Sequence, residues 1–381
     1  MIGVLATIIA LYLLLILAFT LGLRRLPSFE PALQEARHSF SILIVFRDEK
    51  DNLPPLIAHL DQLNYPKDKF EILLIDDASS DGSLKLVKSL QKELPSLNMR
   101  IHEFKTSSFS HKKDALELGV REASFDWIIT TDADCTFDSG FLNAYDQFLN
   151  RHPAKMVAGP VICTAEDSLL DRFQSLDFLS LQGSTMGSFG GRDSIPFLRP
   201  FMCNGANLCY SKEAFLELGG YQGNKDIASG DDVFLLEKML ERHENEVYFI
   251  KSRSALVQTK PKETWKELFE QRKRWASKST AYKNSFAKIV GLLVLLANFS
   301  LILGLALGLA GLIPWPYFGL LFVMKINVDF VLIFNTASLW EQQQAMKSFV
   351  MSSFLYPFFV VGVTLQSLTG SYKWKGRTYK K

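Results

Sequence analysis

In EILLIDDASSDGS, residues 71–83, a short apolar run is followed at once by two aspartates and a turn. A run this short, bounded by Asp, Ser and Gly, predicts a buried strand that leads into a helix. WIITTDADC, residues 127–135, again places two aspartates just beyond a strand. Ligands of parallel sheets lie beyond the carboxyl ends of the strands. We therefore expect both acidic pairs at one ligand-binding edge.

Short apolar runs alternate with segments of helical spacing around these two stretches. This alternation predicts an α/β fold with a mainly parallel sheet covered on both faces. The expected strands are residues 41–46, 71–75, 100–104, 127–130, 156–162 and 247–250, and the expected helices are residues 52–63, 83–94, 112–122, 166–182, 211–218 and 231–241. Residues 183–191 are rich in Gly and Ser and are expected to form a mobile loop.

The composition excludes several classes of protein. Among 381 residues, 42 basic and 40 acidic side chains give a formal net charge of +2. No global field would attract nucleic acid, so no nucleic-acid partner is expected. The four cysteines show no CxxC spacing, which argues against a zinc site and a disulfide framework.

Residues 2–23 form an apolar run that is long enough to cross a bilayer as a helix, and Arg24 and Arg25 follow it. A cleaved signal peptide is the alternative, but no basic segment precedes the run and no clear cleavage site follows it. As an uncleaved anchor in the inner (cytoplasmic) membrane, the run would place Met1 outside and the following domain in the cytoplasm.

Three further apolar segments occupy residues 289–313, 318–339 and 349–368. The middle one carries Lys325 and Asp329, which on a helix form either a neutralised pair or a functional group in the membrane. Four full crossings would leave the basic tail outside, although its positive charges favour the cytoplasm. One of the last two segments is therefore expected to be re-entrant or interfacial.

These features divide the chain into five parts. They are an anchor (1–24), an α/β domain (38–262), an amphipathic interfacial segment (263–288), a C-terminal membrane region (289–370) and a basic tail (371–381).

The acidic pairs suggest chemistry as well as structure. Asp132 and Asp134 alternate along an extended segment, so both carboxylates point to one face. Two carboxylates suit Mg²⁺ or Mn²⁺ that is completed by water and substrate phosphate, although such pairs are also common on loops. Asp76 and Asp77 either cap the turn after their strand or face a ligand.

Two later segments add candidate groups. Asp231 and Asp232 open a helix. One carboxylate there is explained by its favourable interaction with the helix N-terminus, and the second is available as a general base. QRKRW, residues 271–275, belongs to an interfacial helix or places Arg on a diphosphate and Trp against a sugar. Lys112 begins a helix and is either solvated or within reach of a phosphate.

Taken in order, these elements resemble membrane-bound family 2 glycosyltransferases, whose domain has the GT-A (Rossmann-like) fold with a mixed sheet. FRDEKDNL, residues 46–53, is similar to the family's A-R-N-E-E-x-N-L element, and residues 112–116 match its K-x-x-A-L element. Its D-x-D, E-D and Q-x-x-R-W elements correspond to residues 132–134, 231–232 and 271–275. The resemblance covers roughly residues 41–275 and the membrane segments around them.

The resemblance implies a role for each matched position. It implies metal and donor contacts for Asp132 and Asp134, contact with the nucleoside for Asp76 or Asp77, contact with the diphosphate for Lys112 and Arg274 beside Gln271, a catalytic base at Asp232 next to Asp231, and acceptor contact for Trp275. Two departures, Asp231 for the usual Glu and Asp48 for the usual Asn, leave the donor open.

These roles imply an inverting glycosyltransferase that depends on Mg²⁺ or Mn²⁺. It would move a sugar from a nucleotide-sugar donor to a lipid-linked acceptor at the cytoplasmic membrane face. One alternative is a processive polysaccharide synthase of the same family, and another is an inactive, membrane-anchored partner subunit. A nucleotidyltransferase shares the sheet and the metal site, but it needs neither Trp275 nor the base at Asp232.

Overall fold

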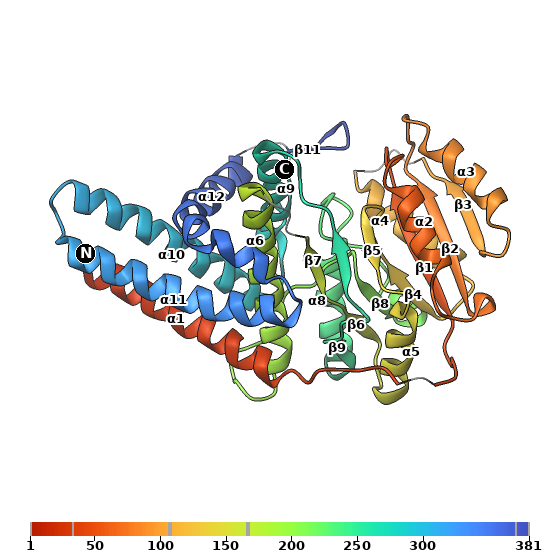
Figure 1. The fold of residues 1–381 in the computed structure, drawn as a ribbon, viewed down its shortest axis with the longest axis horizontal. Helices are drawn as coiled ribbons and strands as arrows, with labels where there is room; N and C mark the ends of the chain where they lie inside the picture. The colour runs from red at the N-terminus through yellow and green to blue at the C-terminus, as the bar shows by residue number, and fades with distance from the viewer. Residues whose placement is uncertain (1, 33, 106–108, 165–167, 370–371, 380–381) are drawn as a thin grey trace.

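The computed structural model describes residues 2–32, 34–105, 109–164, 168–369 and 372–379. Its α/β domain is built on a seven-stranded sheet with the order β3-β2-β1-β4-β8-β6-β9 (Figure 1). The strands are β1 Phe40–Phe46, β2 Phe70–Asp76, β3 Met99–Glu103, β4 Trp127–Thr130, β6 Met156–Ala158, β8 Leu208–Ser211 and β9 Val247–Phe249. The first four strands run parallel, and β8 runs antiparallel to both of its neighbours. The predicted α/β class is confirmed, with a sheet that is mixed.

Alternating side chains of β1 explain why helices cover both faces. Leu43 belongs to the same buried cluster as Leu116 of helix α4, His111–Glu122. Ile44 instead belongs to the cluster that contains Leu56 of helix α2, Leu53–Asp61. Successive side chains of a strand point to opposite faces, so a fully apolar strand needs cover on both. Helices α3 Ser83–Glu93, α7 Lys212–Glu217 and α8 Asp231–His243 also lie within a few residues of their predicted ranges.

A second, three-stranded sheet has the order β5-β10-β7, with β5 Cys135–Phe137, β10 Val257–Thr259 and β7 Val161–Cys163. The strand expected at 156–162 is therefore two strands in two sheets, β6 and β7. The break falls at Gly159, where a Cβ would lie 2.3 Å from the Asn207 side chain. The sequence analysis missed β5, β8, β10 and helix α5, Phe141–Arg151. Strands of three or four residues are too short for their periodicity to be recognised.

The expectation of a mobile loop at 183–191 is wrong, because helix α6 continues from Leu169 to Gly191. Its glycines allow close packing against α1, Ile2–Arg25. A Cβ on Gly187 would lie 2.3 Å from the backbone oxygen of Phe19, and one on Gly22 would lie 2.0 Å from that of Gly187. Small residues let helix backbones approach each other closely in this way. The glycines therefore serve contact between helices and not flexibility.

Four helices are long and apolar enough to cross a membrane: Ile2–Arg25, Ser285–Leu309, Trp315–Leu339 and Gln343–Leu368. They contain α1, α10 Ser285–Leu309, α11 Trp315–Leu339 and α12 Phe349–Thr369. Figure 1 shows α1, α10 and α11 extending together away from the α/β domain, whereas α12 lies nearer to it. Lys325 Nζ lies 2.7 Å from Asp329 Oδ2, and the Tyr12 hydroxyl donates to Asp329 Oδ1. Lys325 and Asp329 therefore form the neutralised ion pair that was one of the two expected alternatives.

Candidate active site

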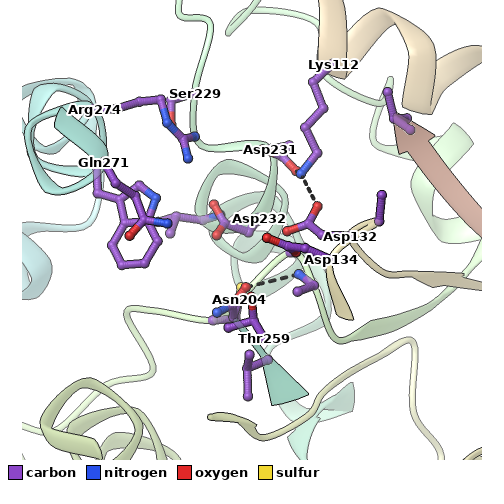
Figure 2. Close-up of a pocket in the computed structure, with 18 of the residues that line it drawn as sticks. Lys112, Asp132, Asp134, Asn204, Ser229, Asp231, Asp232, Thr259, Gln271 and Arg274 are labelled. Atoms are coloured by element: carbon purple, nitrogen blue, oxygen red, sulfur yellow. Dashed lines mark hydrogen bonds and ion pairs between the residues drawn. The ribbon is translucent and has the colours of Figure 1, made fainter. Parts of the chain in front are cut away.

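A cavity of about 620 Å³ lies beyond the carboxyl ends of β1, β2 and β4. It brings together nearly all of the polar residues that the sequence singled out, with others beside them: Arg47, Asp77, Lys112, Asp132, Asp134, Asn204, Asp231, Asp232, Gln271, Arg274, Trp275 and Lys278. Figure 2 shows the aspartates and Lys112 converging from the domain while Gln271 and Arg274 face them from helix α9, Trp265–Ser277. The motifs thus meet in one place, although each comes from a different element.

Lys112 links two of the acidic motifs. Its Nζ lies 2.8 Å from Asp132 Oδ1 and 3.4 Å from Asp231 Oδ2. Burial alone would lower the pKa of Lys112, but the charges of Asp132 and Asp231 outweigh it and raise that pKa. Lys112 is therefore a fixed positive charge in the middle of the cavity, and the solvated alternative does not apply.

Asp134 lies in a different environment, although it is only two residues from Asp132. Burial and the negative charge of Asp132 raise the pKa of the Asp134 carboxyl. Lys262 Nζ is 3.9 Å away, at the limit of an ion pair. Two carboxylates that repel each other at the edge of a cavity fit a divalent cation, because the ion would relieve the repulsion. Within the described ranges, no group of three or more His, Cys, Asp and Glu residues forms a complete metal cage.

Asp232 contacts a partner that the sequence analysis missed. Lys278 Nζ lies 3.0 Å from Asp232 Oδ1. Burial would lower the pKa of Lys278, but the charge of Asp232 outweighs this and the pKa is raised. Burial likewise opposes ionisation of Asp231, yet the charges of Lys112 and Lys278 hold the pKa of its carboxyl below its ordinary value. Both carboxylates at the start of α8 therefore face positive charge across the cavity.

Helix α9 forms the opposite wall and is held by a buried ion pair. Arg272 Nε lies 2.6 Å from Asp177 Oδ2 of α6, and Arg272 also donates to Gln271 Oε1. The Arg272 guanidinium lies over the Trp275 ring, 4.2 Å from its centroid. Arg272 is buried and Arg274 lines the cavity. The basic residues 271–275 therefore do more than border a membrane surface, because Arg272 anchors helix α9 and Arg274 faces the cavity.

The two aspartates after β2 are separated by the structure. Asp77 lines the cavity, whereas Asp76 accepts a hydrogen bond from the backbone of Ser79 at 3.1 Å. Asp76 thus holds the turn, and Asp77 is the one of the pair that lines the cavity.

The sequence contained little signal for three of these features. Lys278 lies three residues beyond the QRKRW stretch with no motif of its own. Asp177 lies within an apolar helix, where one buried acid predicts a partner but not which one. Lys375 of the basic tail also lines the cavity, although the tail was expected only to face the cytoplasm.

Comparison with known proteins shows which family part of the chain resembles. Residues 41–219 match the model described as Glycosyl transferase family 2. A probable glycosyltransferase of Bacillus subtilis, YdaM, is 26% identical over 265 residues, which are 67% of this chain and 60% of that protein. A poly-beta-1,6-N-acetyl-D-glucosamine synthase of Staphylococcus epidermidis is 24% identical over 243 residues, which cover 62% of this chain and 53% of that one. The chain thus spans little more than half the length of these relatives.

The fold has a counterpart among solved structures. The mannosyltransferase PcManGT from Pyrobaculum calidifontis, solved with GDP-Man and Mn²⁺, matches with a TM-score of 0.59 and 16% identity over 96% of this chain and 99% of that one. The α/β domain has the GT-A fold, and its residues 41–219 resemble glycosyltransferase family 2. Both predictions from the sequence are confirmed.

Proposed function

We propose that this glycosyltransferase transfers a sugar, with inversion, from a nucleoside diphosphate donor to a lipid-linked acceptor at the cytoplasmic face of the membrane. The observation that carries the proposal is the convergence of Asp134, Asp232 and Arg274 on one cavity. Such a cavity offers a place for a cation, a base and a charge for the departing diphosphate.

The transfer needs one proton acceptor and one site for the leaving group. Asp232 would take the proton of the acceptor hydroxyl while that oxygen bonds to the anomeric carbon, and the bond to the diphosphate breaks on the opposite face. Lys278 Nζ, 3.0 Å from Asp232 Oδ1, would hold this carboxylate in position. Lys112 and Arg274 would stabilise the charge on the diphosphate. No covalent enzyme intermediate is required.

Asp132 and Asp134 would hold Mg²⁺ or Mn²⁺, which would supply positive charge against the leaving diphosphate. The repulsion between these two carboxylates supports this assignment, as does the Mn²⁺ named with the PcManGT mannosyltransferase.

The acceptor side of the cavity supports a lipid-linked acceptor. Phe178, Leu181 and Thr185 of α6 line the cavity, and the same helix packs on α1 and α11. An acceptor with its apolar anchor in the bilayer can therefore reach Trp275. The relatives that synthesise poly-N-acetylglucosamine favour a processive synthase as the second candidate.

A panel of UDP- and GDP-sugars, offered to membranes that contain the chain, tests the proposal. We expect the nucleoside diphosphate to be released from one donor of the panel, and a single sugar to be added to each lipid acceptor. A ladder of products would favour the synthase. Pyrophosphate release from a nucleoside triphosphate would favour a nucleotidyltransferase, and no turnover of any donor would favour an inactive subunit.

Asp134→Asn should lower transfer by about a hundredfold or more, because the charge that a bound cation supplies amounts to several kcal/mol. Titration of Mn²⁺ at fixed donor measures the effect, and the variant should no longer respond to the ion. Asp126→Asn is the matched control, since Asp126 is exposed just before β4 begins. A variant with a normal Mn²⁺ response would remove Asp134 from the proposed metal site.

We also propose that α12 does not cross the membrane. Glu341, which follows α11, forms an ion pair with Arg253 of the α/β domain. Arg377, after α12, forms another with Asp77. The segments before and after α12 therefore both contact the domain, which argues that the two ends of α12 share its side of the bilayer. This gives three crossings and a cytoplasmic tail.

Labelling of introduced cysteines with an impermeant maleimide in intact cells tests this topology. The four native cysteines are buried, so they should contribute little background. We expect Leu312→Cys, between α10 and α11, to be labelled from outside, and Gln344→Cys to be labelled only after permeabilisation. External labelling of a cysteine added after Lys381 would contradict the proposal.

A further inference from the structure

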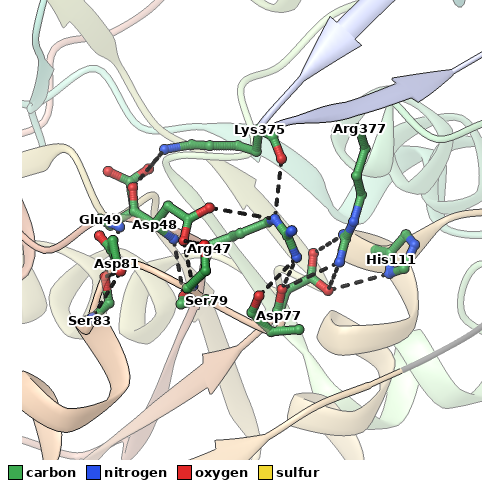
Figure 3. A network of polar contacts seen from close by, with 12 residues as sticks. Arg47, Asp48, Glu49, Asp77, Ser79, Asp81, Ser83, His111, Lys375 and Arg377 are labelled. Atoms are coloured by element: carbon green, nitrogen blue, oxygen red, sulfur yellow. Dashed lines mark hydrogen bonds and ion pairs between the residues drawn. The ribbon is translucent and has the colours of Figure 1, made fainter.

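The C-terminal tail forms a hairpin that returns to the α/β domain. Strand β11, Tyr372–Trp374, pairs antiparallel with β12, Arg377–Tyr379. The turn residues Lys375 and Gly376 have φ of 46° and 74°, and two left-handed residues make the tight turn that suits a hairpin. The hairpin packs on α9 and extends to the loops after β1 and β2 (Figure 3).

The hairpin covers Asp77 through Arg377. Arg377 Nη2 lies 3.1 Å from Asp77 Oδ1, and Nη1 lies 2.5 Å from Oδ2. His111 Nδ1 lies 3.3 Å from Asp77 Oδ1. The side chain of Asp77 is only 2% exposed, and that of Arg377 is 21% exposed. A paired arginine and carboxylate of this geometry is among the strongest side-chain contacts.

The turn of the hairpin is held by residues of the loop after β1. Lys375 Nζ lies 2.7 Å from Glu49 Oε1, and the Lys375 carbonyl accepts from Arg47 Nε. Arg47 also donates to the backbone oxygens of Asp77 and Ala78 at 2.7 and 3.0 Å. One network thus joins the hairpin to both loops at this end of the cavity, as Figure 3 shows.

We propose that this hairpin is an autoinhibitory strap, and that Arg377 occupies the carboxylate that the donor nucleoside must reach. The inference rests on the proposed function, in which Asp77 recognises the nucleoside. A carboxylate has about four lone-pair positions, and Arg377 contacts both oxygens of Asp77 while His111 contacts one. Donor and strap therefore compete for Asp77, and a bound donor releases the hairpin.

With competition of this kind, the apparent dissociation constant of the nucleotide equals its intrinsic value divided by the fraction of time that the site is free. A strap closed for about nine-tenths of the time would weaken nucleotide binding about tenfold. The dissociation constants of UDP and GDP are to be measured by calorimetry on the purified full chain and on Arg377→Ala. We expect about tenfold tighter binding of the preferred nucleotide to Arg377→Ala, and an intermediate value for Arg377→Lys, because lysine cannot chelate both oxygens.

Arg242→Ala is the matched control, since Arg242 is largely exposed and pairs with Glu217 far from the cavity. Hydrogen exchange gives a second readout: the amides of 372–379 should be protected in the free chain and lose protection on nucleotide binding.

The outcomes separate the strap from the donor site. Equal affinity in the variant and the wild type, with the hairpin still protected, would overturn the strap and leave the donor site standing. Weaker binding in Arg377→Ala would overturn it too, because the hairpin would then be part of the nucleotide site. If neither chain binds UDP or GDP, the donor assignment falls and the strap falls with it.

Discussion

Asp232→Asn is expected to lower sugar transfer by about 10²- to 10⁴-fold, the range usual for loss of a general base. Asparagine keeps the shape of aspartate and an oxygen for Lys278, which lies 3.0 Å from Asp232 Oδ1. It cannot take a proton from the acceptor hydroxyl. Binding of the nucleoside diphosphate should therefore be almost unchanged. Initial rates at saturating donor, together with calorimetry of nucleotide binding, measure the two effects separately.

Glu241→Gln is the control for this prediction, since it removes an acid from the outer end of the same helix, where Glu241 is exposed. Parallel loss of transfer and of nucleotide binding in Asp232→Asn would show that Asp232 has a structural role. A variant that keeps near-normal transfer would require another base, and the proposed mechanism would be wrong.

Asp177→Ala should destabilise the protein by about 3–5 kcal/mol, the usual cost of leaving a buried charge without its partner. Asp177 and Arg272 have side chains only 6% and 7% exposed, and they join α6 to α9. Asp177 also accepts from the Tyr356 hydroxyl of α12 at 3.2 Å. Thermal inactivation in native-lipid membranes should begin at a markedly lower temperature.

The double variant Asp177→Ala with Arg272→Met provides the matched control. Replacing both charges by apolar groups should recover much of the lost stability, because no unpaired ion remains buried. Transfer should stay impaired in the double variant, since Arg272 also contacts Gln271 and lies over Trp275. Equal thermal stability of Asp177→Ala and the wild type would show that the pair is not needed to hold α9.

Much of the fold was predictable because it depends on neighbours in the sequence. Strands β1, β2 and β4 are apolar runs bounded by turn residues, and α4 and α8 have helical spacing. Asp132, Asp134 and Asp232 needed only to follow or precede such elements to reach the ligand-binding edge. Short strands such as β5 and β10 carry too few residues for a pattern.

Glycines show where local patterns mislead. Gly183 and Gly187 suggested a loop, yet both lie within helix α6. They are glycines because α11 and α1 approach them too closely for any larger side chain. The choice between Asp76 and Asp77 was equally open from sequence, since only the path of the next turn decides which carboxylate faces the cavity.

The class of fold, the apolar helices and the residue types at the ends of the strands follow from local sequence, since periodicity and turn chemistry act over a few residues. Three contacts follow instead from the packing of distant elements: Lys278 faces Asp232, Asp177 anchors Arg272, and Arg377 covers Asp77, 300 residues away. Contacts over such separations depend on which surfaces meet when helices and strands pack, and no local spacing encodes that.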